Sequence, residues 1–359
     1  MVLRLPRSIA AALIVAGAAL ASCRGSGENA TMVVAMAGPT MGATYSLEVV
    51  AASAADASRF RDMQAAVDSI LASVDADMST YRQDSALARL NHHAEATPFP
   101  VPQALEEVLV RAAEIHAVTD GAFDVTIAPL IHLWGFDRPG SRDAPPTDDE
   151  IAAALAAKGA KSVLVENGFV TKKNPRVTIN LNAIAPGYAV DRIFAALWEA
   201  GARNLMVEVG GEVRVAGSNS QGDPWRIGIN TPAPEAAITD VTTVATVRAG
   251  AVATSGTYRN FFAYQGRRYS HILDPRTGYP VSHDLVSATI LASDCMTADG
   301  LATAAIVLGE ERMRQVMSAM PGIEALFIHR EGSAPERFTV SATNGFPLAR
   351  NDARPASGS

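Results

Sequence analysis

The stretch 270–303 constrains the chain more than any other, because polar side chains, an apolar run and a helix-like segment follow one another within it. It opens with a His, an Asp and an Arg close together, followed by Gly-Tyr-Pro. Residues 285–291 are apolar and partly β-branched, which is typical of a strand. Residues 298–308 are rich in Ala and Leu, so we expect a helix there, with Thr297 as its N-cap and Gly309 as its stop.

A helix over 298–308 places Asp299 and Thr303 on one face, because residues four apart lie above one another. A carboxylate and a hydroxyl in this arrangement supply two oxygen ligands of the kind that Mg²⁺ prefers. The N-terminus of the same helix suits a phosphate group. The spacing by itself leaves a structural role open, in which Asp299 only favours the first turn and Thr303 is a small buried residue.

The N-terminus has the pattern of a bacterial lipoprotein signal peptide. Arg4 and Arg7 form a basic start, and the apolar stretch 9–20 has signal-peptide length. Small residues then precede Cys23, so cleavage after residues 1–22 would leave the Cys23 thiol for a lipid. An ordinary signal peptide with a nearby cleavage site is the alternative. Both interpretations predict export, and the first predicts an anchor in the inner membrane facing the periplasm.

Composition excludes some classes of protein. The net charge is −7 and basic runs are few, which argues against a nucleic-acid-binding protein. If Cys23 carries a lipid, Cys295 is the one free cysteine of the mature chain, so no disulfide framework is possible. We expect a small apolar residue beside the site there, with a reactive thiol as the alternative. Residues 23–35 look like a polar tether, 36–347 like one folded domain, and 348–359 like a disordered tail.

Periodicity predicts mixed helices and strands. Apolar residues at helical spacing predict helices over 57–75 and 105–115, and a further helix is expected after the small-residue turn 182–187. Gly210 and Gly211 lie between alternating segments and predict a hairpin. The other expected strands are 44–50, 124–126, 177–181, 225–229 and 241–247, and 129–136 is expected to be an aromatic-rich connection. Because βαβ alternation is absent, we expect an α+β fold of largely antiparallel sheets with packed helices.

Eight motifs in one order give a resemblance to a known family. TMG, MSTYR, GAFDVTIAPLIHLWGF, NAIAPGYAVDRI, VEVGGEVRVAG, ATSGTYRNFF, SHILDPRTGYP and MTADGLAT run from about residue 32 to 346. In this respect the chain resembles the ApbE family of flavin transferases, which move FMN from FAD onto a Thr of a target protein. The resemblance implies FAD as substrate, Mg²⁺ as cofactor, and a periplasmic or membrane protein carrying the acceptor Thr.

The resemblance also implies roles for matching residues. Asp299 and Thr303 correspond to metal ligands, together with the backbone carbonyl of Ala183, and His271 corresponds to a histidine that assists the transfer. Tyr81, which follows a predicted helix, is also a candidate stacking residue on its own chemistry. The implied FAD contacts are Met41, Tyr81, Ala122, Phe123, Asp124, Asn180, Pro186 and Ile272.

The chain departs from the family pattern at three positions. Asn180 stands where the family usually has Asp, Pro186 where it has Lys, and Gly300 where it has Ala. The missing Lys removes one cation that could meet a pyrophosphate. A periplasmic subgroup similar to NosX has Asn-Leu-Asn-Gly-Ile-Ala at this place, so Asn180 has a precedent. Two alternative functions stay open: FAD hydrolysis to FMN and AMP, and an FAD-binding lipoprotein without transferase activity.

Overall fold

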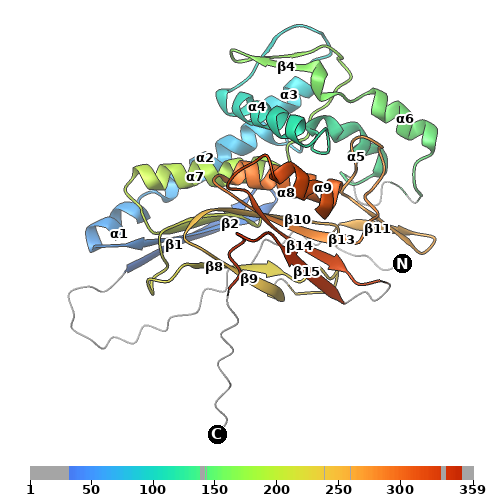
Figure 1. The fold of residues 1–359 in the computed structure, drawn as a ribbon. Coiled ribbons are helices and arrows are strands. Elements are labelled where there is room, and N and C mark those ends of the chain that lie inside the picture. Colours follow the sequence, from blue (N-terminus) through green and yellow to red (C-terminus); the bar gives the residue numbers. More distant parts are fainter. Residues whose placement is uncertain are drawn as a thin grey trace, which may run out of the picture.

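An eight-stranded sheet, antiparallel throughout, organises the computed structural model, which describes residues 32–137, 142, 144–237, 239–258, 260–332 and 337–349 (Figure 1). Its strands lie in the order β1-β2-β6-β7-β10-β13-β14-β15. The bounds are β1 Met32–Thr40, β2 Ala43–Ala51, β6 Leu205–Val209, β7 Glu212–Ala216, β10 Ala249–Gly256, β13 Leu285–Ala292, β14 Glu324–Arg330 and β15 Phe338–Ala342. The prediction of an α+β fold with antiparallel sheets is confirmed.

Both faces of this sheet are covered, which makes three layers (Figure 1). On one face lie α1 (Ala54–Arg61), α2 (Gln64–Met78), α7 (Ala185–Glu199), α8 (Cys295–Leu308) and α9 (Glu310–Met317). The opposite face is covered by a separate hairpin of β8 (Trp225–Asn230) and β9 (Val241–Val247). Because β6 and most of β13 are buried on both sides, their sequences are mostly apolar and do not alternate, and their polar members Glu208, Ser287 and Thr289 are buried too.

A second part of the chain lies beyond the helical layer (Figure 1). It contains a small cluster of buried side chains centred on Leu130, Trp134, Ile151 and Leu273. Its elements are α3 (Ala86–His92), α4 (Gln103–Val118), η1 (Val125–Ile127), α5 (Ala128–Trp134), α6 (Asp148–Ala156) and η2 (Ala160–Ser162), and a sheet of β3 (Phe99–Pro100), β5 (Phe169–Lys172) and β4 (Val163–Glu166). The hairpin of β11 (Phe261–Tyr264) and β12 (Arg267–Ser270) lies beside the large sheet and packs against the same cluster through Phe262 and Tyr269 (Figure 1).

Several predicted elements are confirmed. The hairpin of β6 and β7 turns at Gly210 and Gly211, whose φ angles of 67° and 113° lie where residues with side chains are strained. The run 285–291 forms β13, and α8 ends at Gly309. The helix predicted over 57–75 is instead two helices, because the N–H of Met63 bonds the Phe60 carbonyl three residues back and breaks the α-helical ladder.

The expected strand at 124–126 and the expected connection at 129–136 are wrong. The Asp124 carboxylate accepts a hydrogen bond of 2.8 Å from the N–H of Thr126, which starts the short helix η1. Helix α5 follows directly, with a proline in its first turn, where the missing N–H has no helical partner to lose. The expected N-cap Thr297 is wrong too: Asp294 caps α8, whose first residue is Cys295.

The strand expected at 177–181 is also wrong. More and less buried residues alternate along the segment, but it pairs with no other strand that the structure describes. Its backbone groups bond instead to side chains and to a distant carbonyl: the side chain of Asn91 contacts both the N–H and the C=O of Ile179, and the N–H of Asn180 donates to the carbonyl of Val125. An alternating pattern therefore indicates extended backbone with one buried and one less buried face, and it does not show that a neighbouring strand is present.

The ends of the chain bear on the predicted domain limits. β1 begins at Met32, inside the segment 23–35 that was predicted to be a tether. The predicted signal peptide, Cys23 and residues 350–359 of the predicted tail lie outside the described residues, whereas Ala349 bonds the carbonyl of Val244. Among the helices that the structure describes, none is both long and apolar enough to cross a membrane.

Candidate functional site

A cavity of about 1540 Å³ lies where the second part of the chain meets the sheet and α8. Its walls come from the β6–β7 turn, β8, β10, α5, α8 and the segments 176–183 and 271–275. Its volume exceeds that of a typical pocket for a small organic ligand, so it is large enough for a dinucleotide.

Most of the residues singled out in the sequence meet at this cavity, although they are far apart in the chain. Met41 and Pro186 do not line it. Met41 lies in the β1–β2 turn and packs against the main core, and Pro186 lies in the first turn of α7. The lining residues among those predicted are Tyr81, Ala122, Phe123, Asp124, Asn180, Ala183, His271, Ile272, Asp299 and Thr303.

Asp299 is a buried carboxylate at the base of the cavity. Its Oδ2 accepts a hydrogen bond of 3.1 Å from the N–H of Gly187, at the start of α7. Burial raises the pKa of Asp299 to about 7, with a smaller contribution from the nearby carboxylate of Asp191 and an opposing one from the Gly187 hydrogen bond. A site that destabilises a carboxylate in this way is suited to a cation, because a positive charge would restore the ionised form.

The oxygen atoms around Asp299 fit a magnesium ion. Thr303, one turn further along α8, and Ala183 line the same cavity. Within the described residues no hydrogen-bond donor contacts Oδ1 of Asp299, so that oxygen is available to a ligand. Among all the residues that the structure describes, no group of three or more His, Cys, Asp or Glu side chains could hold a metal ion. The set is therefore one carboxylate with neutral oxygens, which suits a metal that also takes oxygens from a bound phosphate.

Asp191 fixes the start of α8, and sequence reasoning missed it. Its carboxylate accepts hydrogen bonds of 2.9 Å from the N–H groups of Cys295 and Met296, and it pairs with Arg214 at 2.6 Å. The only sequence signal is an acidic residue on a helix whose neighbours are largely apolar. Cys295 is fully buried, and burial raises its pKa well above the ordinary value, so the prediction of a small apolar residue rather than a reactive thiol is confirmed.

His271 is held in one orientation at the cavity wall. Its Nδ1 lies 3.0 Å from the carbonyl of Asn260, and the ring meets Phe136 edge-on. A carbonyl only accepts hydrogen bonds, so Nδ1 carries the proton and Nε2 of the neutral ring has a free lone pair. Burial lowers the pKa of His271, which favours the neutral form. This histidine can therefore accept a proton near neutral pH.

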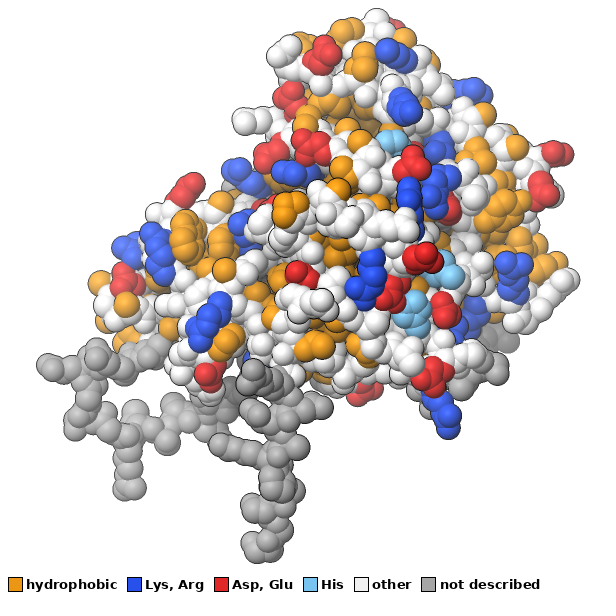
Figure 2. Space-filling view, viewed as in Figure 1, with side chains coloured by type: hydrophobic (Ala, Val, Ile, Leu, Met, Phe, Trp, Pro, Cys, Tyr) orange, Lys and Arg blue, Asp and Glu red, His pale blue; other side chains and the backbone are white. Residues whose placement is uncertain are grey.

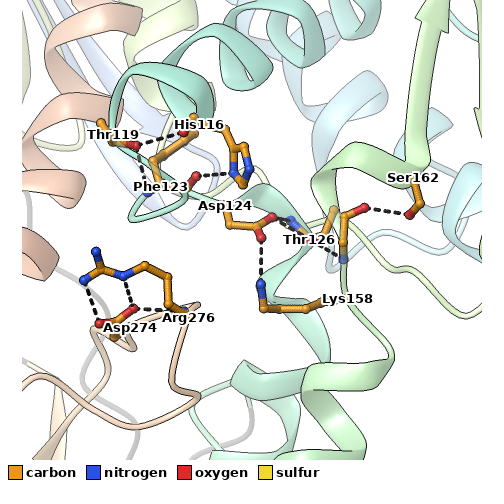
Figure 3. A network of polar contacts seen from close by, with 10 residues as sticks. His116, Thr119, Phe123, Asp124, Thr126, Lys158, Ser162, Asp274 and Arg276 are labelled. Carbon is orange, nitrogen blue, oxygen red and sulfur yellow. Dashed lines mark hydrogen bonds and ion pairs between the residues drawn. The ribbon is translucent and has the colours of Figure 1, made fainter.

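A polar network fixes the wall that carries Phe123 and Asp124 (Figure 3). Nδ1 of His116 lies 2.9 Å from the carbonyl of Phe123, and the hydroxyl of Thr119 accepts from the N–H of Phe123. The Asp124 carboxylate pairs with Lys158 at 3.0 Å. These contacts show that Asp124 has its own counter-ion and shapes the backbone rather than presenting a free charge.

On the face shown in Figure 2, acidic and basic side chains are interspersed, and basic side chains do not form one continuous patch there. Neutral and apolar surface separates them. On this face, electrostatic attraction for a polyanion is therefore local rather than extended.

Comparison with known proteins gives the family. A model of the ApbE family matches residues 41–327. A FAD:protein FMN transferase from Vibrio cholerae is 41% identical over 300 residues, which cover 84% of this chain and 87% of the relative. One from Salmonella typhimurium is 35% identical over 299 residues, covering 82% and 84%.

Solved structures agree with this assignment. The flavin transferase ApbE from Vibrio cholerae superposes with a TM-score of 0.77 at 38% identity, covering 88% of this chain and 98% of the other. The flavinyl transferase ApbE from Pseudomonas stutzeri, in its apo form, superposes with a TM-score of 0.76 at 35% identity, covering 88% and 95%. The motifs, the fold and these matches agree, and the chain belongs to the ApbE family.

Proposed function

We propose that this enzyme transfers FMN from FAD to the hydroxyl of a threonine in a target protein and releases AMP. Membership of the ApbE family and the shared name of its relatives support flavin transfer from FAD to a protein. The observation that carries the proposal is that one dinucleotide-sized cavity brings together His271, Asp299 and Thr303. Phosphoryl transfer depends on positioning the reactants and on stabilising the charge of the phosphates. An oriented base, a buried carboxylate and a cavity that can hold both phosphates of FAD meet these needs.

The reaction breaks one phosphoanhydride bond and forms one phosphoester bond. The threonine oxygen attacks the phosphorus of the FMN half of FAD, and the bond from this phosphorus to the oxygen bridging to AMP breaks. Nε2 of His271 takes the hydroxyl proton. It can do so because the backbone carbonyl of Asn260 keeps the proton of the neutral ring on Nδ1. AMP leaves with the bridging oxygen.

We propose that Asp299, Thr303 and the carbonyl of Ala183 hold Mg²⁺ beside the pyrophosphate. When bound, Mg²⁺ supplies charge neutralisation for the pyrophosphate and for the departing phosphate. The chain's own residues contribute the binding geometry: Gly187 orients the Asp299 carboxylate, and Asp191 holds the first turn of the helix that carries it.

The decisive experiment separates transfer, hydrolysis and mere binding. Purified protein is incubated with FAD, Mg²⁺ and candidate periplasmic domains that contain a threonine, and intact masses are measured. Transfer predicts an added phosphoriboflavin group on one domain together with AMP. Release of free FMN and AMP without an adduct would show a hydrolase, and FAD recovered unchanged with every domain would show a binding protein.

We further propose that the mature protein begins at Cys23, is lipid-anchored to the inner membrane and acts on periplasmic or membrane targets. The small residues before Cys23 and the apolar stretch 9–20 support this. A Cys23→Ala variant should remain unprocessed or leave the membrane fraction. A mature N-terminus at another residue, with unchanged fractionation, would exclude the anchor.

A further inference from the structure

The segment 176–182 presents a row of polar side chains to the cavity. Val177, Ile179 and Leu181 are fully buried in the core. The residues between and beside them point the other way, because side chains alternate along extended backbone. The cavity-lining members are Arg176, Thr178, Asn180 and Asn182, which we call the polar ridge.

A buried lysine holds the end of the polar ridge. The Lys172 ammonium has no exposed surface, and its three N–H groups face three backbone carbonyls. The distances are 3.0 Å to Asn91, 3.4 Å to Pro175 and 3.2 Å to Val177. Two of these carbonyls flank Arg176, so its backbone is fixed although its side chain is exposed. A fixed backbone reduces the entropy lost when the guanidinium binds a ligand.

Asn91 holds the middle of the same ridge. Its amide nitrogen donates to the carbonyl of Ile179 at 2.9 Å, and its carbonyl oxygen accepts from the Ile179 N–H at 2.8 Å. These bonds replace the ladder that a neighbouring strand would provide. The segment can therefore stand at the edge of the cavity without a strand beside it and keep its polar side chains turned inward.

Two of the acidic side chains that line the cavity have partners within the protein. Asp124 pairs with Lys158 at 3.0 Å, and Asp137 lies 2.9 Å from the ring of His132. The acidic side chains that line the cavity, in the part of the chain that the structure describes, are Asp124, Asp137, Glu212 and Asp299. An anionic dinucleotide that binds in this cavity needs a positively charged side chain that is not already paired with a carboxylate of the protein.

Arg176 has that charge. It is the one Lys or Arg among the described lining residues. Within the described chain no carboxylate contacts its guanidinium, which also makes no hydrogen bond. A guanidinium presents a planar set of donors that matches two phosphate oxygens at once.

We propose that Arg176 binds a phosphate of the FAD pyrophosphate and that the polar ridge is the wall against which the pyrophosphate lies. This inference rests on the proposed function, because it assumes FAD as the substrate. It gives the chain a pyrophosphate cation at a position different from Pro186, where the family usually has Lys. Arg176 acts on substrate affinity and not on the proton transfer assigned to His271.

The test measures binding of FAD, ADP and adenosine by calorimetry to the wild type, Arg176→Gln, Arg176→Lys and Arg312→Gln. Arg312 is exposed on α9 and does not line the cavity, so it is the matched control. Arg176→Gln should bind FAD and ADP about 10-fold more weakly, while adenosine binding stays unchanged. Arg176→Lys should lie between the two, and added salt should weaken the wild type more than Arg176→Gln. In transfer assays KM for FAD should rise with little change in kcat.

Each other outcome is decisive. Equal affinity of wild type and Arg176→Gln for FAD and ADP would overturn the inference and leave the transferase function standing. An equal loss for ADP and adenosine would also overturn it, since it would show contact with the adenine ring instead of phosphate. A wild type that binds no FAD would overturn the proposed function and this inference together.

Discussion

The backbone N–H of Gly187 donates a hydrogen bond of 3.1 Å to Oδ2 of Asp299, which lies 112 residues later in the chain. This bond joins the first turn of α7 to the second turn of α8. The helices approach closely there: a Cβ atom on residue 187 would lie 2.5 Å from the carbonyl oxygen of Cys295. The orientation of the carboxylate therefore depends on glycine at position 187.

We predict that Gly187→Ala lowers the free energy of unfolding by about 1–3 kcal/mol, because the obstructing atoms are backbone and cannot rotate away. Denaturant unfolding measures this. Gly300→Ala is the contrast, since the one short contact of its new Cβ would be with the terminal Cδ1 of the Ile115 side chain, at 2.6 Å, and helical Ala is favoured over Gly. Equal losses for the two variants would contradict the explanation from backbone contact.

Replacing Asp299 with Asn should abolish Mg²⁺-dependent transfer, at least about 100-fold, since the metal would lose its charged protein ligand. Thr303→Ala should weaken transfer less. Because burial raises the pKa of Asp299 from 3.8 to about 7, its protonation stabilises the metal-free protein fully below pH 3.8, and this stabilisation is lost as the pH rises through 7. Added Mg²⁺ should therefore raise the Tm of the wild type at pH 8 but not that of Asp299→Asn. A wild-type transfer rate for Asp299→Asn across a full Mg²⁺ titration would exclude the metal site.

The pH dependence of transfer should reflect His271. Burial lowers its pKa below the ordinary value of 6.5, so the imidazole stays neutral and able to accept a proton down to pH values below 6.5. At saturating Mg²⁺, which keeps Asp299 ionised, the acid limb of kcat/KM should lie below pH 6.5. His271→Asn should reduce kcat by about 10²–10⁴-fold and remove that limb. A limb that persists in His271→Asn would assign the base to another group.

Glu208 offers a stability test outside the proposed machinery. It is buried on β6, accepts hydrogen bonds from Gly211 and Ser46, and burial raises its pKa from 4.5 to about 7. The folded state thus binds this proton more tightly, so the stabilisation is complete below pH 4.5 and is lost as pH rises through 7. Glu208→Gln should be more stable than wild type at pH 8, by up to about 3 kcal/mol, and about equal at pH 4.5. Denaturant unfolding at both pH values checks this; a pH-independent difference would contradict it.

A substitution of Tyr81 tests whether a side chain at the rim of the cavity contributes to FAD binding. Its side chain is 72% exposed yet lines the cavity, so its ring can stack on a flat ligand without supporting the core. Tyr81→Ala should weaken FAD binding about 10-fold, since stacking on an aromatic ring contributes about 1–3 kcal/mol. Its Tm should match the wild type. Trp198→Ala removes an exposed ring from outside the cavity and should leave FAD affinity unchanged; equal affinities for all three proteins would remove Tyr81 from the site.

The sequence alone determined what depends on neighbours along the chain. Helical spacing predicted α4, the pair Gly210 and Gly211 predicted the β6–β7 turn, and the apolar run 285–291 predicted β13. Motif order predicted the family, and with it most of the residues that meet at the cavity, although not Met41 and Pro186, which lie outside it. These signals are local, because periodicity, capping and turn chemistry act over a few residues.

Only the tertiary structure decided features that depend on distant partners. The segment 177–181 alternates like a strand but bonds to Asn91, which lies 88 residues away from Ile179, so no local pattern distinguishes the two cases. In the same way Asp191 reaches the start of α8 across 104 residues, and the burial of Asp299 arises where α7 and α8 meet. Burial and long-range hydrogen bonds set charge and orientation at the site, and both come from the packing of separate elements rather than from residue order.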